Sequence, residues 1–450
     1  MTASDVARQV GGRTPGRAAY VALLTTSTLG TLSSTVMSAP INDITAELRA
    51  SPQETVLAVS AFTVAMVVFA PLAGWLSERL GMTRFLVGSL LLMVAGQAGA
   101  AVAPGIGVLV AMRAVQGIAC SGIPPAIQKG LSDFWPDRRA RSMAAWASAI
   151  GIGQAVGPLV GGVVSEFFGW RALFGLYAVV CLGVLAVVVR YVPWVPAGHP
   201  ALETGPMAQL LGGAGLLIVG LTWAGQGGAP LTCAALILPG VAVLCWALRT
   251  RRDGSHLLGD ALRDRAYVVA TVAAGAGMCG LGITMVGLPL YLGRDLGLGA
   301  GLIGAVVFAV AIGMSVFGPI ASRLSGRYGA EPTLAGGLVL LLGCAVAMAV
   351  LEATVHGTVV LVPMVVVLLL IGCGVATVQS MAALVLLGGR PRAGLALGVH
   401  NMGRFGGLAL GYAWVAGCYA LGLPVLVHAG LALVAGAAAL TLLWRRPGRL

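Results

Sequence analysis

Charged residues are scarce in this chain: they make up 9% of its 450 residues, whereas 58% are hydrophobic. A soluble domain carries about 25% charged residues because its surface faces water. The shortage excludes a chain built mainly of soluble domains and indicates that lipid covers most of the surface. A membrane-spanning helix needs roughly 20 mainly apolar residues, so nearly the whole chain can be divided into such helices.

Several patterns with chemical functions are also missing. The eight cysteines form no C-x-x-C pair and lie in apolar stretches, so we interpret them as small buried residues. No G-x-x-x-x-G-K-[ST] loop occurs, which argues against ATP as the direct energy source. No cluster of Asp, Glu, His or Cys marks one membrane face, so we expect neither an enzyme nor a metal site; a polytopic membrane enzyme is the alternative.

Positive charge is plentiful by comparison, with a net charge of +12. Such a balance can indicate nucleic-acid binding, but Lys and Arg also gather in the cytoplasmic loops of membrane proteins. We therefore expect the lipid bilayer, and no nucleic acid, as a partner.

The apolar runs predict fourteen spanning helices, since only helices or closed barrels satisfy backbone hydrogen bonds in lipid and the runs are too long for barrel strands. With the N-terminus in the cytoplasm, alternate crossing places 22 basic residues inside and three outside. We expect a cell (inner) membrane protein with both termini cytoplasmic and an uncleaved first span. The expected spans are 18–38, 54–77, 85–103, 106–128, 141–165, 171–191, 207–224, 230–249, 266–291, 298–322, 331–352, 358–386, 394–418 and 424–444.

The spans fall into two halves around an insert. Residues 1–195 hold six spans, 196–261 hold two inserted spans with linkers, and 262–450 hold six more. The segment 74–81 is echoed by 321–329 in the second half. Two bundles of six related by a parallel repeat describe one major transporter architecture, so we expect an all-α polytopic membrane protein.

Three short motifs carry the functional interpretation. Residues 74–84 read G-W-L-S-E-R-L-G-M-T-R, residues 109–117 fit L-x-x-x-R-x-x-Q-G, and residues 153–162 fit G-x-x-x-G-P-x-x-G-G. Together they resemble the major facilitator superfamily, and within it the fourteen-span drug–proton antiporter branch, over the whole chain. The resemblance implies two six-helix bundles plus two inserted helices, acting without a cofactor by alternating access on a proton gradient.

The first motif resembles the family's gate, with Glu78 in place of Asp and Met82 in place of a usual basic residue. Its glycines allow close helix approach and a tight turn, and the Glu78 carboxylate could cap the N-terminus of span 394–418. An ordinary charged loop is the alternative. The gating residues are Gly74, Glu78, Arg79, Gly81 and Arg84.

The second motif places Arg113, Gln116 and Gly117 inside a span. An arginine inside a membrane is costly and marks function by default, and this one resembles the arginine near the family's proton-coupling site. Snorkelling to the outer interface is the alternative.

The third motif contributes Gly153, Gly157, Pro158, Gly161 and Gly162. Glycines at helical spacing make a flat face for close backbone approach, and Pro158 removes one backbone bond. The pattern resembles the family's antiporter signature and so favours export. A substrate–proton symporter of the same fold is the alternative.

The proton carrier is not visible in the sequence. Members of this branch carry an Asp in the first span, where this chain has Ser33. Arg113 with a water, Asp43 or His400 could substitute. Arg404 needs a partner, either a carbonyl or an anionic substrate, unless its role is structural.

Hydroxyl side chains at Thr28, Thr31 and Thr35 share one face of the first span. In the family this span lines the central cavity, so the stripe is expected to face substrate; bonding to its own backbone carbonyls is the alternative. Gln379 and Ser380 are further cavity candidates. The expected cargo is a small amphiphilic or cationic compound carried by a monomer.

Overall fold

The computed structural model describes residues 15–443 except 38–39, 51, 199–203, 226–227, 250–262, 295, 299, 356, 389–393 and 424–425. Within these residues every regular element is a helix, which confirms the all-α prediction. Ten helical stretches are long and apolar enough to cross a membrane. The chain is therefore a multi-pass membrane protein, and the count of fourteen spans stays a prediction.

The helices from α2 to α8, which we call the N-terminal set, pack against one another. Helix α2 lies along α8, α4 lies along α6, and α5 contacts both α6 and α8. The set comprises α2 (Arg17–Thr35), α3 (Ile41–Glu47), α4 (Pro52–Leu80), α5 (Met82–Ala101), α6 (Ile106–Ser121), α7 (Ile123–Phe134), the 3-10 turn η1 (Pro136–Arg138) and α8 (Arg139–Tyr191).

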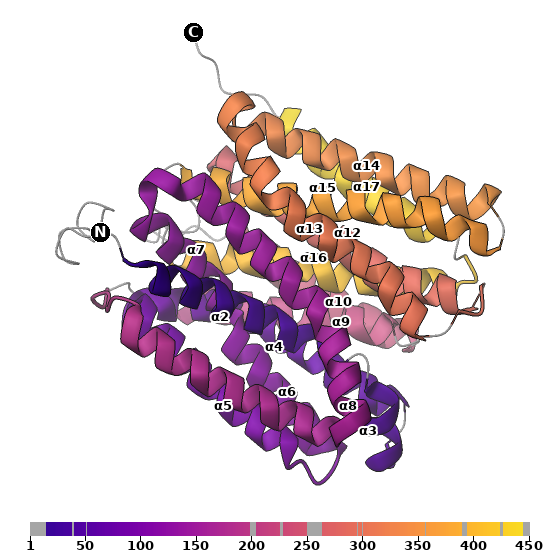
Figure 1. Cartoon of the computed structure of the whole chain (residues 1–450), viewed down its shortest axis with the longest axis horizontal. Helices are drawn as coiled ribbons and strands as arrows, with labels where there is room; N and C mark the ends of the chain where they lie inside the picture. Colours follow the sequence, from indigo (N-terminus) through magenta and orange to yellow (C-terminus); the bar gives the residue numbers. More distant parts are fainter. Residues whose placement is uncertain are drawn as a thin grey trace.

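The helices from α12 to α17, the C-terminal set, form a second group (Figure 1). Helix α12 packs on α15, α16 and α17, and α15 packs on α13 and α14. The set comprises α12 (Arg265–Arg294), α13 (Ala300–Tyr328), α14 (Ala330–Thr354), the 3-10 turn η2 (Thr358–Val360), α15 (Leu361–Gly388), α16 (Gly394–Ala420) and α17 (Val427–Leu443).

The two sets meet mainly through three pairs of helices. Helix α4 packs on α16, and α8 packs on α13 and α15. Between the sets in sequence, α9 (Thr204–Gly225) and α10 (Pro230–Arg249) form a pair, and α9 contacts both α4 and α16. The inserted pair thus lies beside the contact between the two sets.

Single glycines with positive φ reverse the chain between helices. Gly81 (φ 82°) separates α4 from α5, and Gly329 (φ 92°) separates α13 from α14. Gly169 (φ 79°) divides α8 between the two spans expected at 141–165 and 171–191. The two similar segments, 74–81 and 321–329, therefore end in the same backbone conformation, which residues other than glycine rarely adopt.

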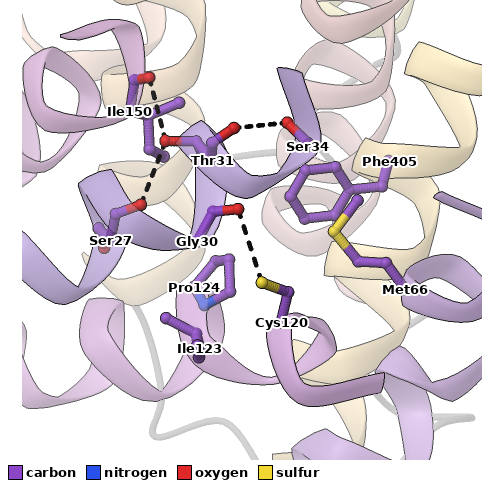
Figure 2. Close-up of a pocket in the computed structure, with 10 residues that line it drawn as sticks. All are labelled: Ser27, Gly30, Thr31, Ser34, Met66, Cys120, Ile123, Pro124, Ile150 and Phe405. Atoms are coloured by element: carbon purple, nitrogen blue, oxygen red, sulfur yellow. Dashed lines mark hydrogen bonds between the residues drawn. The ribbon is translucent and has the colours of Figure 1, made fainter. Parts of the chain in front are cut away.

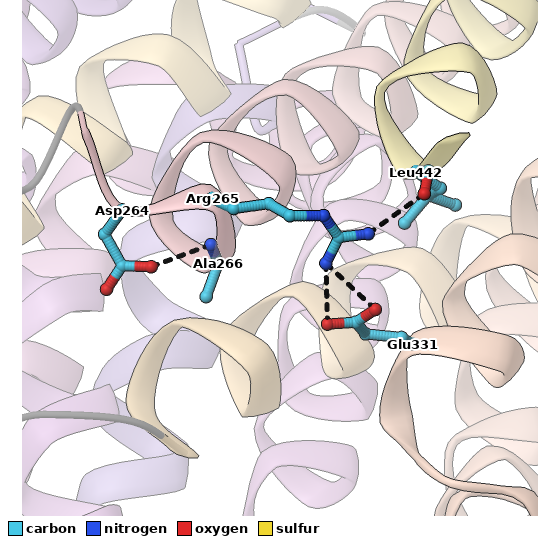
Figure 3. A network of polar contacts seen from close by, with 5 residues as sticks. All are labelled: Asp264, Arg265, Ala266, Glu331 and Leu442. Atoms are coloured by element: carbon cyan, nitrogen blue, oxygen red, sulfur yellow. Dashed lines mark hydrogen bonds and ion pairs between the residues drawn. The ribbon is translucent and has the colours of Figure 1, made fainter. Parts of the chain in front are cut away.

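Charged residues at the helix ends tie several helices together. Arg265, at the start of α12, lies 2.9 Å from the Glu331 carboxylate at the start of α14 and donates to the Leu442 carbonyl near the end of α17 (Figure 3). Arg171 bonds Glu47 and the Ala103 carbonyl. Each group joins helix ends that alternate crossing would place on the same side of the membrane.

The cysteines are mostly small buried residues, as expected. All eight are free, and six are buried; Cys373 is half-buried and Cys245 is exposed on α10. Since helices of this chain face lipid, an exposed thiol on α10 needs no polar partner.

Replacing Gly81 tests the helix reversal. We expect Gly81→Val to lower thermal stability, because a β-branched residue at positive φ costs about 1–3 kcal/mol and its Cβ would overlap the Val195 carbonyl. Gly88→Val in α5 is the matched control, since no other atom lies within 4 Å of a Cβ there. Melting temperatures of the purified proteins check this, and equal values for both variants would contradict it.

Candidate functional site

The helix expected at 106–128 is broken in the middle. Helix α6 ends at Ser121 and α7 begins at Ile123. Pro125 has no N–H to donate to the Ser121 carbonyl four residues earlier, and the Asn401 side chain of α16 donates to that carbonyl instead, at 2.9 Å. The break therefore gives the N-terminal set a carbonyl that binds the C-terminal set.

A small pocket lies next to this break. Figure 2 shows its lining from α2, α4, α6, α7, α8 and α16. Its volume of about 10 Å³ has room for about one water molecule, whereas pockets for drug-sized ligands measure about 300–1,000 Å³. The pocket is closed to such ligands in this conformation. Its lining residues are Ser27, Gly30, Thr31, Ser34, Met66, Cys120, Ile123, Pro124, Ile150 and Phe405.

Arg113 points into the N-terminal set and not toward the membrane surface. Its side chain is fully buried. Nη1 donates to the Ser33 carbonyl at 2.9 Å and to Gln116 Oε1 at 2.7 Å, and Nε donates to the Ala58 carbonyl at 3.4 Å. The guanidinium also lies 4.6 Å from the centre of the Phe62 ring. The snorkelling alternative is therefore wrong.

The rest of the second motif packs α6 against its neighbours. Gln116 donates to the Gly96 carbonyl of α5 at 3.0 Å. A Cβ at Gly117 would overlap the Phe62 carbonyl of α4, so this glycine permits close contact of α6 with α4. The motif thus holds Arg113 in place through helix packing.

Arg404 is the corresponding buried charge of the C-terminal set. It is fully buried, with 0% of its surface accessible. Nη1 contacts Asn401 Oδ1 at 3.4 Å, and the guanidinium lies 4.8 Å from the ring centres of Trp146 and Phe405. Nε and Nη2 have no hydrogen-bond partner among the described residues.

The other candidates of the C-terminal set are buried at separate places. His400 Nδ1 lies 3.0 Å from the Thr271 hydroxyl, and Gln379 donates to the Ala274 carbonyl at 2.9 Å. Both contacts join helices within this set. The buried Ser380 hydroxyl has no partner among the described residues. None of these three residues lines the pocket.

The hydroxyl stripe of α2 faces α8 in this structure, and its role in lining a substrate cavity stays a prediction. Thr28 donates to the Ala149 carbonyl at 3.1 Å, and Thr31 contacts the Ile150 carbonyl at 3.3 Å. Thr35 contacts the Leu32 carbonyl of its own helix at 3.4 Å. Of the three, only Thr31 also lines the pocket. The alternative of bonding to the carbonyls of its own helix also occurs, since Thr28 donates to the Leu24 carbonyl and Thr31 to the Ser27 carbonyl, both at 3.2 Å.

The glycines of the third motif form the other side of this contact. A Cβ at Gly153 would overlap Thr31, one at Gly157 would overlap Thr35, and one at Gly161 would overlap the Val36 carbonyl. The predicted flat glycine face exists, and it packs on α2. Gly162 is half-buried, and Pro158 lies within α8.

The first motif contacts the segment that follows α8. The Gly198 N–H donates to the Glu78 carbonyl at 2.9 Å, and the Thr83 hydroxyl bonds the Pro193 carbonyl. Within the motif, the Ser77 hydroxyl donates to the Gly74 carbonyl at 2.8 Å. Arg79 and Arg84 are exposed. Residues 389–393, just before α16, lie outside the described residues, so the cap by Glu78 stays a prediction.

Two titratable contacts lie at helix ends. Asp43 accepts from the Ser165 hydroxyl at 3.1 Å. His428, which the sequence analysis did not single out, lies 2.8 Å from the Glu352 carboxylate. The sequence does not point to this pair, because the two residues are 76 positions apart and His428 stands alone at the start of an apolar helix. No group that could hold a metal occurs among the described residues.

Three central residues were missed by the sequence analysis: Trp146, Asn401 and Phe405. None of them belongs to one of the three motifs. The tandem prolines at 124–125 were the available signal for the break beside them.

Bulk at Gly157 tests the contact between α2 and α8. We expect Gly157→Leu to insert in the membrane but to lose its native packing, seen as a lower melting temperature and a broader size-exclusion peak. Gly157→Ala should lie between it and wild type, since its single Cβ already overlaps Thr35. Gly183→Leu, also in α8, has open space around its Cβ and should behave as wild type. A stable, monodisperse Gly157→Leu would show that this contact is loose.

Comparisons with known proteins agree with this geometry. The methyl viologen resistance protein SmvA of Salmonella typhimurium is 28% identical over 321 residues, covering 69% of this chain and 64% of that protein. The multidrug resistance protein Stp of Mycobacterium tuberculosis is 26% identical over 369 residues, covering 79% of this chain and 67% of that protein. The chain thus spans slightly less than two thirds of SmvA.

A solved structure shows the same fold. The crystal structure of the human organic anion transporter MFSD10 (TETRAN) superposes with a TM-score of 0.71, covering 96% of this chain and all of that one, at 17% identity. The family model described as Major Facilitator Superfamily matches residues 21–412 and 270–450. Because this match extends over most of the chain, the chain belongs to the Major Facilitator Superfamily.

Proposed function

We propose that this transporter exports small drug-like or antibiotic compounds by alternating access, driven by the proton gradient. The glycine face of α8 carries the proposal. It has the full antiporter pattern of the family, and its three glycines contact α2. The names of SmvA and Stp, which refer to methyl viologen resistance and multidrug resistance, support drug-like cargo.

The contacts between the two sets support a rocking motion. The Ser148 hydroxyl of α8 donates to the Ser315 carbonyl of α13 at 3.2 Å, and Gly398 of α16 closely approaches the Ala70 carbonyl of α4. Single hydrogen bonds and glycine contacts can be exchanged at small cost, about 0.5–1.5 kcal/mol for each bond. Since the pocket has room for only about one water molecule, a substrate could enter it only if the two sets separated.

The proposal includes the arrangement in the membrane. Residues 1–195 and 262–450 would form the two moving bundles, with 196–261 as two inserted helices, fourteen spans in all. The protein would work as a monomer in the inner membrane. Glu78, near the end of α4, the helix that packs on α16, would hold one of the two arrangements of the bundles.

The orientation can be tested with reporter fusions. A reporter at the C-terminus should be active in the cytoplasm, because 22 of the 27 basic residues then lie on the cytoplasmic side. A second fusion after residue 227, between α9 and α10, should be active outside. Cytoplasmic activity at both positions would show that the expected spans are miscounted.

Inverted membrane vesicles test transport and its coupling. Wild type should accumulate a compound of a drug panel when the pH gradient is imposed and release it when the gradient is collapsed. Transport in the opposite direction would favour the symporter of the same fold.

Arg113→Ala in the same vesicles tests the coupling site. We expect at least a tenfold loss of uphill transport with normal insertion, because Arg113 stays charged and sets the field at the α2–α4–α6 contact. Arg113→Lys keeps the charge but loses the planar fork, so it should retain part of the activity. Arg190→Gln, which removes an exposed arginine stacked on Tyr191, is the control. Wild-type uphill transport in Arg113→Ala would remove this residue from coupling.

A further inference from the structure

The interior of the described structure carries positive charge only. Arg113 and Arg404 are both fully buried, and no Asp or Glu of the described residues is buried. The ion pairs that the described carboxylates make lie at helix ends, as with Glu47, Glu331 and Glu352. A buried charge without a counterion is costly and is normally paired.

The two arginines differ in how their donors are used. Arg113 uses Nε and Nη1 on carbonyl oxygens of its own helix set, so that only its Nη2 lacks a partner among the described residues. Arg404 uses only Nη1, on Asn401. Its Nε–H and one Nη2–H point in the same direction and form the edge of the guanidinium that binds a carboxylate with two parallel hydrogen bonds. In Arg404 both of these atoms lack a partner among the described residues.

The free edge of Arg404 lies at the junction of the two helix sets. Arg404 is the eleventh residue of α16, about 15 Å from the start of the helix at 1.5 Å per residue. Its guanidinium lies over the Trp146 ring of α8 in the other set, and the indole N–H of Trp146 also lacks a partner. Two side chains that contact each other across the junction thus each have N–H donors without a partner among the described residues.

The closed pocket adjoins this arginine. Phe405, which follows Arg404 and contacts its guanidinium, lines the pocket. So does Ile150, one helical turn after Trp146. The rest of the lining is mainly apolar, with Met66 facing Phe405 in Figure 2, and the hydroxyl of Ser27 in it has no partner. The surroundings suit a ligand with an anionic group and an apolar, aromatic part.

We propose that the free Nε–Nη2 edge of Arg404 binds the carboxylate of an aromatic organic anion, and that such anions are the substrate class of this transporter. The aromatic part would occupy the pocket beside Phe405 once the helix sets separate. Only the statement that such anions are transported rests on the proposed function; the binding of a carboxylate by Arg404 does not depend on it. It replaces the sequence-based expectation of a cationic compound, because a cation would meet two buried arginines and no buried carboxylate.

Binding measurements on the purified full-length protein test this directly. Isothermal titration calorimetry would compare 1-naphthoate with its uncharged analogue 1-naphthamide and with the cation 1-naphthylmethylammonium. Wild type should bind 1-naphthoate at least tenfold more tightly than 1-naphthamide and should bind the cation least. Equal affinity for the anion and the amide, or no binding of 1-naphthoate, would overturn the proposal.

Variants test whether Arg404 causes the preference for 1-naphthoate over 1-naphthamide. Arg404→Gln should reduce the preference for the anion over the amide to within about twofold. Arg404→Lys keeps the charge without the fork and should retain an intermediate preference, which covers the case in which Arg404→Gln does not fold. Arg190→Gln, whose arginine is also stacked on an aromatic ring but exposed, should keep the wild-type preference. An undiminished preference in Arg404→Lys and Arg404→Gln would overturn the assignment.

The vesicle assay separates this proposal from the proposed function. Uphill export of cations that survives Arg404→Gln would leave proton-driven export standing and contradict anion binding as the basis of substrate choice. Arg404-dependent binding of 1-naphthoate, without uphill transport of any compound, would support the anion site and contradict proton-driven export.

Discussion

Two buried guanidinium groups without a buried counterion set the conditions for the rest of this structure. An arginine at the centre of a spanning helix costs about 2.5–3.5 kcal/mol in insertion measurements. Arg113 recovers part of that cost from the carbonyls of Ser33 and Ala58 and from the Phe62 ring, with only Nη2 left without a partner among the described residues. It therefore ties α2 and α4 to α6. Arg404 has only Asn401 and two aromatic rings, so its compensation is incomplete and lies partly in the other helix set.

The glycines decide which helices stay together and which can part. Lipid tails are as apolar as the side chains, so helices associate through close packing and hydrogen bonds. Within the N-terminal set, three glycines of α8, spaced four residues apart over about two helical turns, lie against α2 and the residue that follows it. Between the sets, the close approaches are isolated, as at Gly318, where an added Cβ would lie 2.9 Å from the Ala144 carbonyl oxygen. A long glycine face supports a rigid set, whereas isolated contacts support an interface that moves.

The sequence predicted the parts of this architecture that depend on one helix at a time. Apolar length predicted the helices, helical spacing predicted the glycine face, and the position of Arg113 within an apolar run singled out a side chain that is fully buried. It could not predict which neighbour a face meets. The stripe of Thr28, Thr31 and Thr35 was assigned to a substrate cavity, but it fits the α8 glycines, because hydroxyl groups on a crowded face can bond carbonyls that glycines bring within reach. The pairing of Arg404 with Trp146 was hidden for the same reason, since it joins residues far apart in the chain.

The break between α6 and α7 links these features. Pro125 frees the Ser121 carbonyl, and Asn401 binds it from the other set while its own Oδ1 accepts from Arg404. One amide thus connects the interrupted helix to the incompletely paired charge. In the proposed alternating access the sets would separate, and this amide and the freed carbonyl would exchange their bond for bonds to water at little cost. The same separation would expose the free edge of Arg404 to a ligand. Because the closed pocket has room for only about one water molecule, a ligand that neutralises the arginine would stabilise the separated arrangement, and its release would favour closure.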